Sequence, residues 1–184
     1  MSGTIDLFGV ESRPSRAMGS HHAASTGQDE WLTPPELIRN LGPFDLDPCS
    51  PINRPWPTAN RHLTVVDDGL RQQWDGLVWL NPPYSRANRW LARLANHAPG
   101  GIALLFARTE TALWHQHVWP HVDAVLFLRG RLHFHHVDGR RAAANAGAPS
   151  ALAAYGEVAA DRLRGSALPG VVVGKPTPTL TEAS

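Results

Sequence analysis

The chain has 184 residues, enough for one domain with a sizeable hydrophobic core. Its 17 basic and 16 acidic residues give a formal net charge of +1, which neither requires nor excludes a nucleic-acid partner, and its one cysteine, Cys49, excludes an intrachain disulfide and a multi-cysteine zinc site. No apolar run approaches the roughly 20 residues that span a bilayer, and the N-terminus has no signal-peptide pattern, so we expect a cytoplasmic protein that does not bind a membrane.

Composition divides the chain into three parts. Residues 1–28 are rich in Ser, Gly, Ala and His without an apolar period, which predicts a flexible N-terminal arm. Residues 29–165 carry the periodic apolar segments and form the predicted folded domain. Residues 166–184 are rich in Pro and Thr, which predicts a flexible C-terminal tail, although the three valines at 171–173 also suit a short edge strand.

The predicted domain begins with a helix. The segment 33–36, Thr-Pro-Pro-Glu, has the pattern of a capping box with proline at the first helical position, and the helix should end near Gly42. A short strand follows over 44–47 and ends in an acid. The apolar segment 77–80 predicts a second strand, which runs directly into 81–84, Asn-Pro-Pro-Tyr.

The second half of the domain alternates strands and helices. A helix is predicted over 86–97, with Trp90, Leu91 and Leu94 facing inward. The remaining predicted elements are buried strands over 102–107 and 124–128, a helix over 111–119, and a final antiparallel strand pair over 132–136 and 151–155. This alternation indicates a compact α/β fold: a mostly parallel sheet covered on both faces, with an antiparallel C-terminal strand pair.

Two polar residues directly follow predicted strands. Asp47 ends the strand over 44–47, and Asn81 follows the strand over 77–80. Ligands of such sheets bind beyond the carboxyl ends of the strands. We therefore expect Asp47 and Asn81 to lie at one edge of the sheet, where the chemistry takes place.

The segment 81–84 suits the methylation of a planar amine. The exocyclic amine of adenine delocalises its lone pair into the ring, so a site that methylates it should offer acceptors to both amine protons. The Asn81 side-chain oxygen and the Pro82 carbonyl are such acceptors, and Pro82 and Pro83 fix the backbone that carries them. Tyr84 offers a flat face for an extruded base. The alternative interpretation is a simple turn that ends the strand.

Six segments add a wider pattern around this motif. They are 31–37 (Trp-Leu-Thr-Pro-Pro-Glu-Leu), 44–50 (Phe-Asp-Leu-Asp-Pro-Cys-Ser), 68–70 (Asp-Gly-Leu) with Trp74, 78–85 (Val-Trp-Leu-Asn-Pro-Pro-Tyr-Ser), 130–132 (Gly-Arg-Leu) with Phe134, and 148–152 (Ala-Pro-Ser-Ala-Leu). Over about residues 29–156 the chain resembles the phage-type DNA N6-adenine methyltransferases. The resemblance implies a Rossmann-like S-adenosylmethionine-dependent methyltransferase fold that methylates N6 of adenine in double-stranded DNA.

The resemblance also implies which residues bind the cofactor, S-adenosylmethionine. Trp31, Thr33 and Pro34 would lie over the cofactor, where a helix N-terminus favours its carboxylate, although Thr33 can equally be a helix cap. Asp68 resembles the residue that binds the amine of the cofactor's adenine. The segment 67–69, Asp-Asp-Gly, is also an ordinary turn pattern.

The segment 47–49, Asp-Pro-Cys, resembles the cofactor loop after the first strand. In that loop Asp47, with Pro48 and Cys49, would hold the amino group of the methionyl part. No Gly-x-Gly follows Asp47, and Ser-Pro-Ile-Asn stands at 50–53 instead. The acid that usually binds the cofactor ribose in such enzymes has no clear counterpart in this sequence. Asn53 and Asn60 are the candidate substitutes for it.

The predicted DNA contacts are the four arginines Arg86, Arg89, Arg129 and Arg131. Arg86 and Arg89, together with Arg93, fall near one face of the helix after the motif. This face could contact DNA phosphates, and the alternative interpretation is an ordinary solvated helix face. Arg129 and Arg131 flank Gly130. The segment 136–149 is the candidate for recognition of the target sequence. No metal site is expected, because His115 and His117, two residues apart, do not share a helix face, and His133 and His135 have no acidic partner nearby.

Three other functions remain open from the sequence. Cytosine N4 and protein glutamine N5 methyltransferases act on similarly delocalised nitrogens, and a relative without a cofactor site would bind DNA without catalysis. We expect a monomer or weak homodimer that acts in the cytoplasm, or in the host cell cytoplasm if the protein is encoded by a phage.

Overall fold

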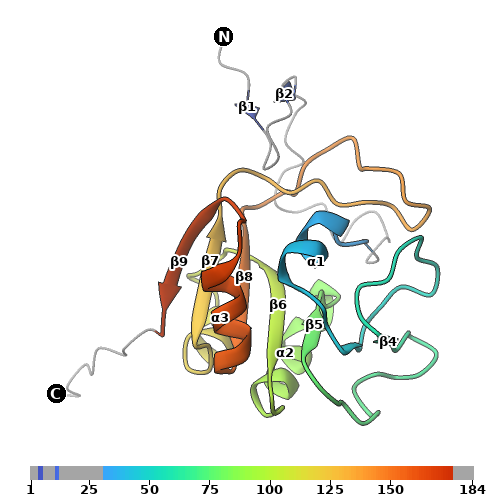
Figure 1. Ribbon diagram of the computed structural model, residues 1–184, viewed down its shortest axis with the longest axis vertical. Helices are drawn as coiled ribbons and strands as arrows, with labels where there is room; N and C mark the ends of the chain where they lie inside the picture. Colours follow the sequence, from blue (N-terminus) through green and yellow to red (C-terminus); the bar gives the residue numbers. More distant parts are fainter. Residues whose placement is uncertain (1–3, 6–10, 13–30, 176–184) are drawn as a thin grey trace, which may run out of the picture.

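Seven strands form the sheet at the centre of the computed structural model, which describes residues 4–5, 11–12 and 31–175 (Figure 1). The strands are β3 (Leu46–Asp47), β4 (Arg61–His62), β5 (Val78–Leu80), β6 (Gly101–Phe106), β7 (Ala124–Leu128), β8 (Ser150–Tyr155) and β9 (Gly170–Gly174). Their order across the sheet is β4-β3-β5-β6-β8-β7-β9. The first four run parallel, whereas β8 is antiparallel to both neighbours and β9 is antiparallel to β7. The mixed α/β class is therefore confirmed, and the parallel arrangement holds for one half of the sheet.

Helices cover both faces of this sheet. They are α1 (Pro35–Leu41), the short 3-10 helix η1 (Tyr84–Arg86), α2 (Ala87–Ala95), the π-helical turn η2 (Trp114–Val118) and α3 (Glu157–Gly165). Trp79 of β5 packs on the side of α1 and α3, whereas its neighbours Val78 and Leu80 pack on the side of α2 and η2. This alternation is the period-two pattern of a strand that is buried on both faces.

The helix α2 has the inward face that the sequence predicts. Trp90, Leu91 and Leu94 are buried, and η1 continues directly from the Pro-Pro segment into α2.

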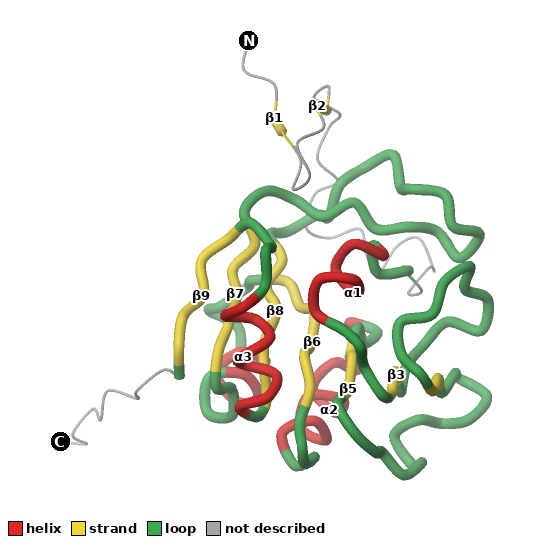
Figure 2. The backbone as a smooth tube through the Cα atoms, viewed as in Figure 1, coloured by secondary structure: helices red, strands yellow, loops and turns green. Residues whose placement is uncertain are grey.

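The loops on either side of the parallel strands are long (Figure 2). Function-bearing side chains therefore come mainly from loops that a rigid sheet positions.

The predicted antiparallel pair of 132–136 with 151–155 is wrong. β8 lies between β6 and β7 instead, with Leu152 opposite Leu104 on one side and Leu126 on the other. All six residues of β8 are buried, so this apolar run is stabilised by neighbours on both sides. The segment 132–136 forms only isolated bridges, from His135 to Leu32 and to Arg141.

The predicted capping box before α1 is also wrong. Pro34 occupies the cap position, and no side chain caps the helix. Thr33 turns away, because its hydroxyl oxygen accepts a hydrogen bond from Trp79 Nε1 at 3.3 Å and its carbonyl accepts one from Trp56 Nε1 at 3.1 Å. The predicted end is confirmed: the Gly42 N–H donates to the Ile38 carbonyl at 2.8 Å.

The ends of the chain are described in part. Within the predicted arm 1–28, β1 (Thr4–Ile5) and β2 (Glu11–Ser12) form a short antiparallel pair, and the other residues lie outside the described part. The valines at 171–173 form the edge strand β9, so the sheet continues past residue 165. Residues 176–184 lie outside the described part. No helix among the described residues is long and apolar enough to cross a membrane.

Candidate functional site at the carboxyl ends of the strands

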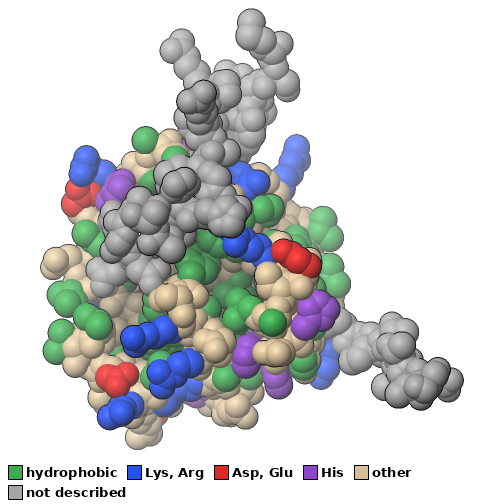
Figure 3. Space-filling model, turned by 180° about the vertical axis from the view of Figure 1, so that it is seen from behind, with side chains coloured by type: hydrophobic (Ala, Val, Ile, Leu, Met, Phe, Trp, Pro, Cys, Tyr) green, Lys and Arg blue, Asp and Glu red, His purple; other side chains and the backbone are tan. Residues whose placement is uncertain are grey.

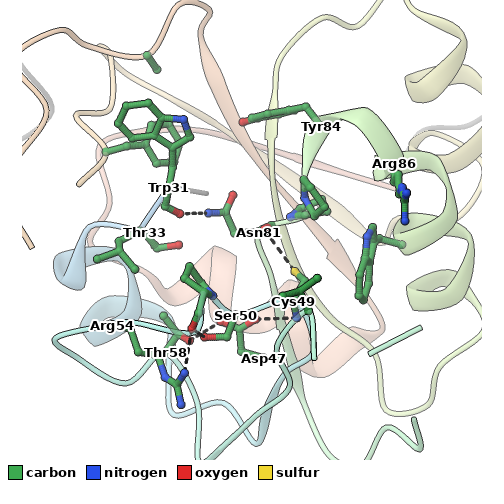
Figure 4. Close-up of a pocket in the computed structure, with 18 of the residues that line it drawn as sticks. Trp31, Thr33, Asp47, Cys49, Ser50, Arg54, Thr58, Asn81, Tyr84 and Arg86 are labelled. Carbon is green, nitrogen blue, oxygen red and sulfur yellow. Dashed lines mark hydrogen bonds between the residues drawn. The ribbon is translucent and has the colours of Figure 1, made fainter. Parts of the chain in front are cut away.

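A pocket of about 750 Å³ opens at the carboxyl ends of β3, β5 and β6. The chain leaves β3 for β4 on one side and continues from β5 to β6 on the other, so the strand order reverses between β3 and β5. A crevice forms at such a reversal and is where ligands of open α/β sheets bind. Asp47 and Asn81 stand on its two sides and both line the pocket, as Figure 4 shows.

Most residues that the sequence singles out meet in this pocket. Those that line it are Trp31, Thr33, Asp47, Pro48, Cys49, Asp68, Asn81, Pro82, Pro83, Tyr84 and Arg86. Pro34, Arg89, Arg129 and Arg131 do not line it, and neither do the two candidate ribose ligands, Asn53 and Asn60. The structure adds residues that the sequence did not assign to the site, among them Arg54, Thr58 and Trp90. The residues 142–147, from the segment expected to recognise the target sequence, line the pocket as well.

The orientation of the Asn81 side chain is fixed by its neighbour Trp31. Asn81 Nδ2 donates a hydrogen bond to the Trp31 carbonyl at 3.0 Å. A carbonyl can only accept, so the nitrogen of the amide must face Trp31 and the oxygen Oδ1 must face away from it. Figure 4 shows this oxygen directed toward the end of the pocket bounded by Trp31 and Tyr84. Asn81 therefore presents an acceptor to a ligand rather than a donor.

The backbone of Asn81 is joined to the loop after β3. Cys49 Sγ donates to the Asn81 carbonyl at 3.3 Å. Burial raises the pKa of the Cys49 thiol well above its usual range, with a further contribution from the charge of Asp47, so the thiol stays neutral and keeps its proton. The loops after β3 and β5 are thus held together directly beside the pocket.

Tyr84 is supported from β6. Its ring stacks on that of Phe106, with centroids 4.2 Å apart and planes within 5° of parallel. Pro83 precedes it at the start of η1 and limits the backbone freedom of the turn. A supported aromatic ring at the pocket wall is suited to contact a flat, apolar ligand face.

Asp47 is a buried carboxylate with an unusual environment. It is 3% exposed, and burial raises its pKa from 3.8 to about 6, although three partners oppose the rise. Thr58 Oγ1 donates to Oδ2 at 2.5 Å, the Cys49 N–H donates to Oδ1 at 3.2 Å, and Arg54 lies near enough to lower the pKa further. A buried acid with few charged partners is poised to pair with a cationic ligand.

A histidine positions Thr58 for this contact. His62 Nε2 accepts hydrogen bonds from the backbone N–H groups of Thr58 at 3.1 Å and Ala59 at 3.3 Å. Burial, with the nearby Arg54, lowers the pKa of His62 to about 4, so the ring is neutral and free to accept. No sequence signature links Thr58 and His62 to Asp47, and only the fold brings them together.

Gly69 lets the loop 68–70 pack tightly against the loop that follows Asp47. A Cβ atom at Gly69 would lie 1.9 Å from the Pro48 carbonyl oxygen, and 3.2 Å from the ring of Trp90. The Gly69 carbonyl accepts a hydrogen bond from Trp74 Nε1 at 2.8 Å. The absence of a side chain at residue 69 therefore allows the segment 68–70 to pack directly onto the loop 47–49.

We expect Gly69→Ala to destabilise the protein by about 1–3 kcal/mol, because the added methyl group overlaps a backbone carbonyl that cannot move without disturbing the loop of Asp47. Urea unfolding would measure the loss. Gly165→Ala is the matched control, since a Cβ there meets no atom within 4 Å and alanine favours the end of α3. Equal stability of the two variants would show that the packing at Gly69 is not tight.

The basic side chains divide into two groups. Arg93 donates to the carbonyls of Leu70 and Gln72 and lies over the Trp74 ring, so it holds the loop 68–74 rather than extending a phosphate track. Arg131 Nη1 donates to the Ala146 carbonyl at 3.3 Å. Arg86, Arg89 and Arg129 are exposed. Figure 3 shows a face on which groups of Lys and Arg side chains lie around apolar ones.

The histidine clusters do not assemble a metal centre in the part of the chain that the structure describes. There, no three side chains of His, Cys, Asp or Glu are arranged so that they could hold a metal ion. His135 and His136 instead make ring contacts with Trp56 and Trp31, respectively.

Comparison with known proteins gives one match. The model of the family described as DNA N-6-adenine-methyltransferase (Dam) matches residues 20–163, which include the whole pocket. No curated protein and no solved structure matches the chain.

Proposed function

The chain belongs to the DNA N-6-adenine-methyltransferase (Dam) family, and from this premise we propose that it transfers a methyl group from S-adenosylmethionine to N6 of adenine in double-stranded DNA. The observation that carries the proposal is the orientation of Asn81, whose amide oxygen is turned into the pocket by the Nδ2 contact with the Trp31 carbonyl. The reversal of strand order beside it supports a Rossmann-like methyltransferase fold for the predicted domain, to whose sheet β9 adds an edge strand beyond residue 165.

Asn81 and Pro82 act on the amine of the target adenine. S-adenosylmethionine supplies the methyl group on a positively charged sulfur. The Asn81 Oδ1 and the Pro82 carbonyl accept hydrogen bonds from the two amine N–H groups, which draws the nitrogen toward a pyramidal geometry with its lone pair available. With S-adenosylmethionine bound beside Asp47, the N6 lone pair would receive its methyl group, and the surplus proton on N6 would leave to water. Pro82 and Pro83 keep the acceptors in place, and Tyr84 contacts the extruded base.

The residues around Asp47 fit the cofactor. A buried carboxylate at 3% exposure needs a cation, and the amino group of the methionyl part is one. Pro48 and Cys49 shape the same loop. Thr33 lines the pocket just before α1, and Pro34 follows it at the helix cap without lining the pocket. Asp68, on its left-handed turn (φ 51°), offers a carboxylate to the adenine amine of the cofactor. Thr58 keeps Asp47 in position from behind.

The exposed arginines are proposed to bind the DNA backbone. Arg86 ends η1 and lines the pocket, Arg89 lies in the first turn of α2, and Arg129 directly follows β7. Arg131 acts differently, because its contact with the Ala146 carbonyl fixes the loop that closes the pocket. The side chains of Arg86, Arg89 and Arg129 would contact phosphates and position the duplex without reading its sequence.

Cofactor affinity is expected to fall at acid pH. Asp47 must be ionised to pair with an ammonium group, and its pKa is about 6, so affinity should drop about tenfold for each pH unit below 6. The stability of the free protein should respond in the opposite direction. The folded pKa lies above the usual 3.8, so ionisation of Asp47 costs stability as the pH rises from about 4 to about 6.

Titration calorimetry with S-adenosylmethionine between pH 5 and pH 8 would measure this dependence. In the Asp47→Asn variant, the change in cofactor affinity around pH 6 should disappear. An affinity of the unaltered protein that stays constant from pH 7 to pH 5 would show that Asp47 does not hold the ammonium group.

The proposed function is tested by incubating the protein with methyl-labelled S-adenosylmethionine and unmethylated DNA, followed by nucleoside analysis. Label in N6-methyladenine is the expected result. Label in N4-methylcytosine would identify cytosine, and not adenine, as the substrate. Label in a protein glutamine would identify a protein, and not DNA, as the substrate. Absence of transfer together with absence of cofactor binding would contradict an enzymatic function.

A further inference from the structure

The pocket has two ends, which meet at Asn81. Figure 4 shows Thr33, Asp47, Ser50 and Thr58 below Asn81, and Trp31 and Tyr84 above it on opposite sides. The lower end carries the buried carboxylate, whereas the upper end is bounded by aromatic rings and receives the Asn81 oxygen. If the cofactor occupies the polar end, the upper end is the one left for the target base.

We propose that Trp31 forms the wall of this base slot opposite Tyr84, with His136 behind it, instead of contacting the cofactor. The inference rests on the proposed function, since it assigns the place of the adenine within the same site. Adenine is a flat, largely apolar ring once it leaves the duplex, and aromatic side chains on both sides of a slot replace the stacking that it loses.

The ring of Trp31 is held in place by the loop after β7. Its centroid lies 5.1 Å from that of His136, with the planes tilted by 46°, and both residues line the pocket. The neighbouring residues form a two-way bridge: the Leu32 N–H donates to the His135 carbonyl at 2.9 Å, and the His135 N–H donates to the Leu32 carbonyl at 3.1 Å. The wall is therefore a fixed part of the pocket.

Trp31 joins the base slot to the catalytic amide. The same residue that supplies the ring also supplies the carbonyl that fixes Asn81 Nδ2. Side-chain substitution removes the ring and leaves the carbonyl, so the two roles can be separated by experiment. His136 lies at the start of the segment 136–149, from which 142–147 also line the pocket, so the same segment that was expected to recognise the target sequence forms part of the base slot.

The test compares Trp31→Ala and Trp31→Phe with the unaltered protein in two measurements. The first is kcat/KM for unmethylated plasmid DNA at saturating S-adenosylmethionine, and the second is the Kd of S-adenosylmethionine without DNA. For Trp31→Ala we expect kcat/KM for DNA to fall roughly 10- to 100-fold while the Kd changes less than about twofold. Trp31→Phe should retain most of the activity, because a phenyl ring preserves an aromatic wall. His136→Ala should show a smaller loss of the same kind.

The opposite pattern would overturn the inference. A tenfold or larger rise in the Kd of S-adenosylmethionine, with kcat/KM for DNA unchanged at saturating cofactor, would place Trp31 against the cofactor. If Trp31→Ala does not fold in thermal unfolding, Trp31→Leu and His136→Ala carry the same comparison. Failure of the unaltered protein to methylate adenine would overturn the proposed function and the inference together, whereas an active protein with unaffected variants would overturn the inference alone.

Discussion

Asn81→Ala is expected to reduce methyl transfer to adenine by at least about 10²- to 10³-fold, the loss typical of removing one preorganised acceptor or donor from a reacting centre. The affinity for S-adenosylmethionine should change little, because the side chain of Asn81 contacts Trp31 and faces away from Asp47. Initial rates with labelled cofactor and a separate calorimetric Kd measure the two quantities. Asn40→Ala, at an exposed position on α1, is the matched control.

Asn81→Asp tests the orientation of the amide more finely. The Asp side chain keeps an oxygen acceptor but lacks the Nδ2 donor of Asn81. One of its carboxylate oxygens would face the Trp31 carbonyl oxygen, and because both atoms are negative, the side chain should turn away from Trp31. Transfer should fall to a level between those of the unaltered protein and Asn81→Ala. Loss of cofactor binding in parallel with transfer in both variants would mean that Asn81 supports the pocket as a whole and does not act on the amine.

Asp47→Asn is expected to weaken S-adenosylmethionine binding by about 10- to 100-fold, because a hydrogen bond from a cation to a neutral amide replaces one to a buried carboxylate. The same substitution should leave the free protein at least as stable at pH 8. Burial raises the pKa of Asp47 to about 6, which means that its ionised form is unfavourable in the folded protein. The Asn side-chain oxygen can still accept from Thr58, and relief of the buried charge offsets the lost hydrogen bond from the Cys49 N–H, which Nδ2 cannot accept.

Calorimetry and urea unfolding at pH 8 would check both parts of this prediction. Asp75→Asn is the control, since Asp75 is an exposed partner of Arg61 outside the pocket and its loss should affect neither quantity measurably. Unchanged cofactor affinity in Asp47→Asn would contradict the placement of the methionyl amino group. A large loss of stability would show that Asp47 acts mainly as a structural anchor for Thr58 and Cys49.

The sheet edge that carries the site could be predicted because its signals are local. An apolar strand that runs into Asn81, and a shorter one that ends at Asp47, each indicate a position at the carboxyl edge, and parallel strands bring such positions together. The α2 face could be predicted for the same reason, since its periodicity is contained within one helix.

The features that could not be predicted depend on contacts between distant segments. β8 and the segment 132–136 both look like strands, and only the burial of all six β8 residues between β6 and β7 decides which one enters the sheet. Thr33 has the composition of a helix cap, but the indole of Trp79 takes its hydroxyl oxygen. Arg93 and Arg131 read as surface charges and instead bind backbone carbonyls.

The contacts of Asp47 within the site could not be predicted for the same reason, because they join segments that are distant in the sequence. Thr58 and His62 complete it from the loop before β4 and from β4 itself, at separations that no motif records. Gly69 supplies the close approach to Pro48 from yet another loop. Sequence patterns thus identified many of the residues that line the pocket, whereas the residues that hold them in place emerged only from the fold.

The most direct test is the modified-nucleoside content of DNA from a bacterial host that lacks adenine methylation and expresses this protein. Chromatography of the digested DNA with mass detection should show N6-methyldeoxyadenosine in cells with the unaltered protein and only background in cells with Asn81→Ala at the same expression level. DNA without N6-methyldeoxyadenosine from cells that contain the folded, unaltered protein would contradict adenine methylation at Asn81.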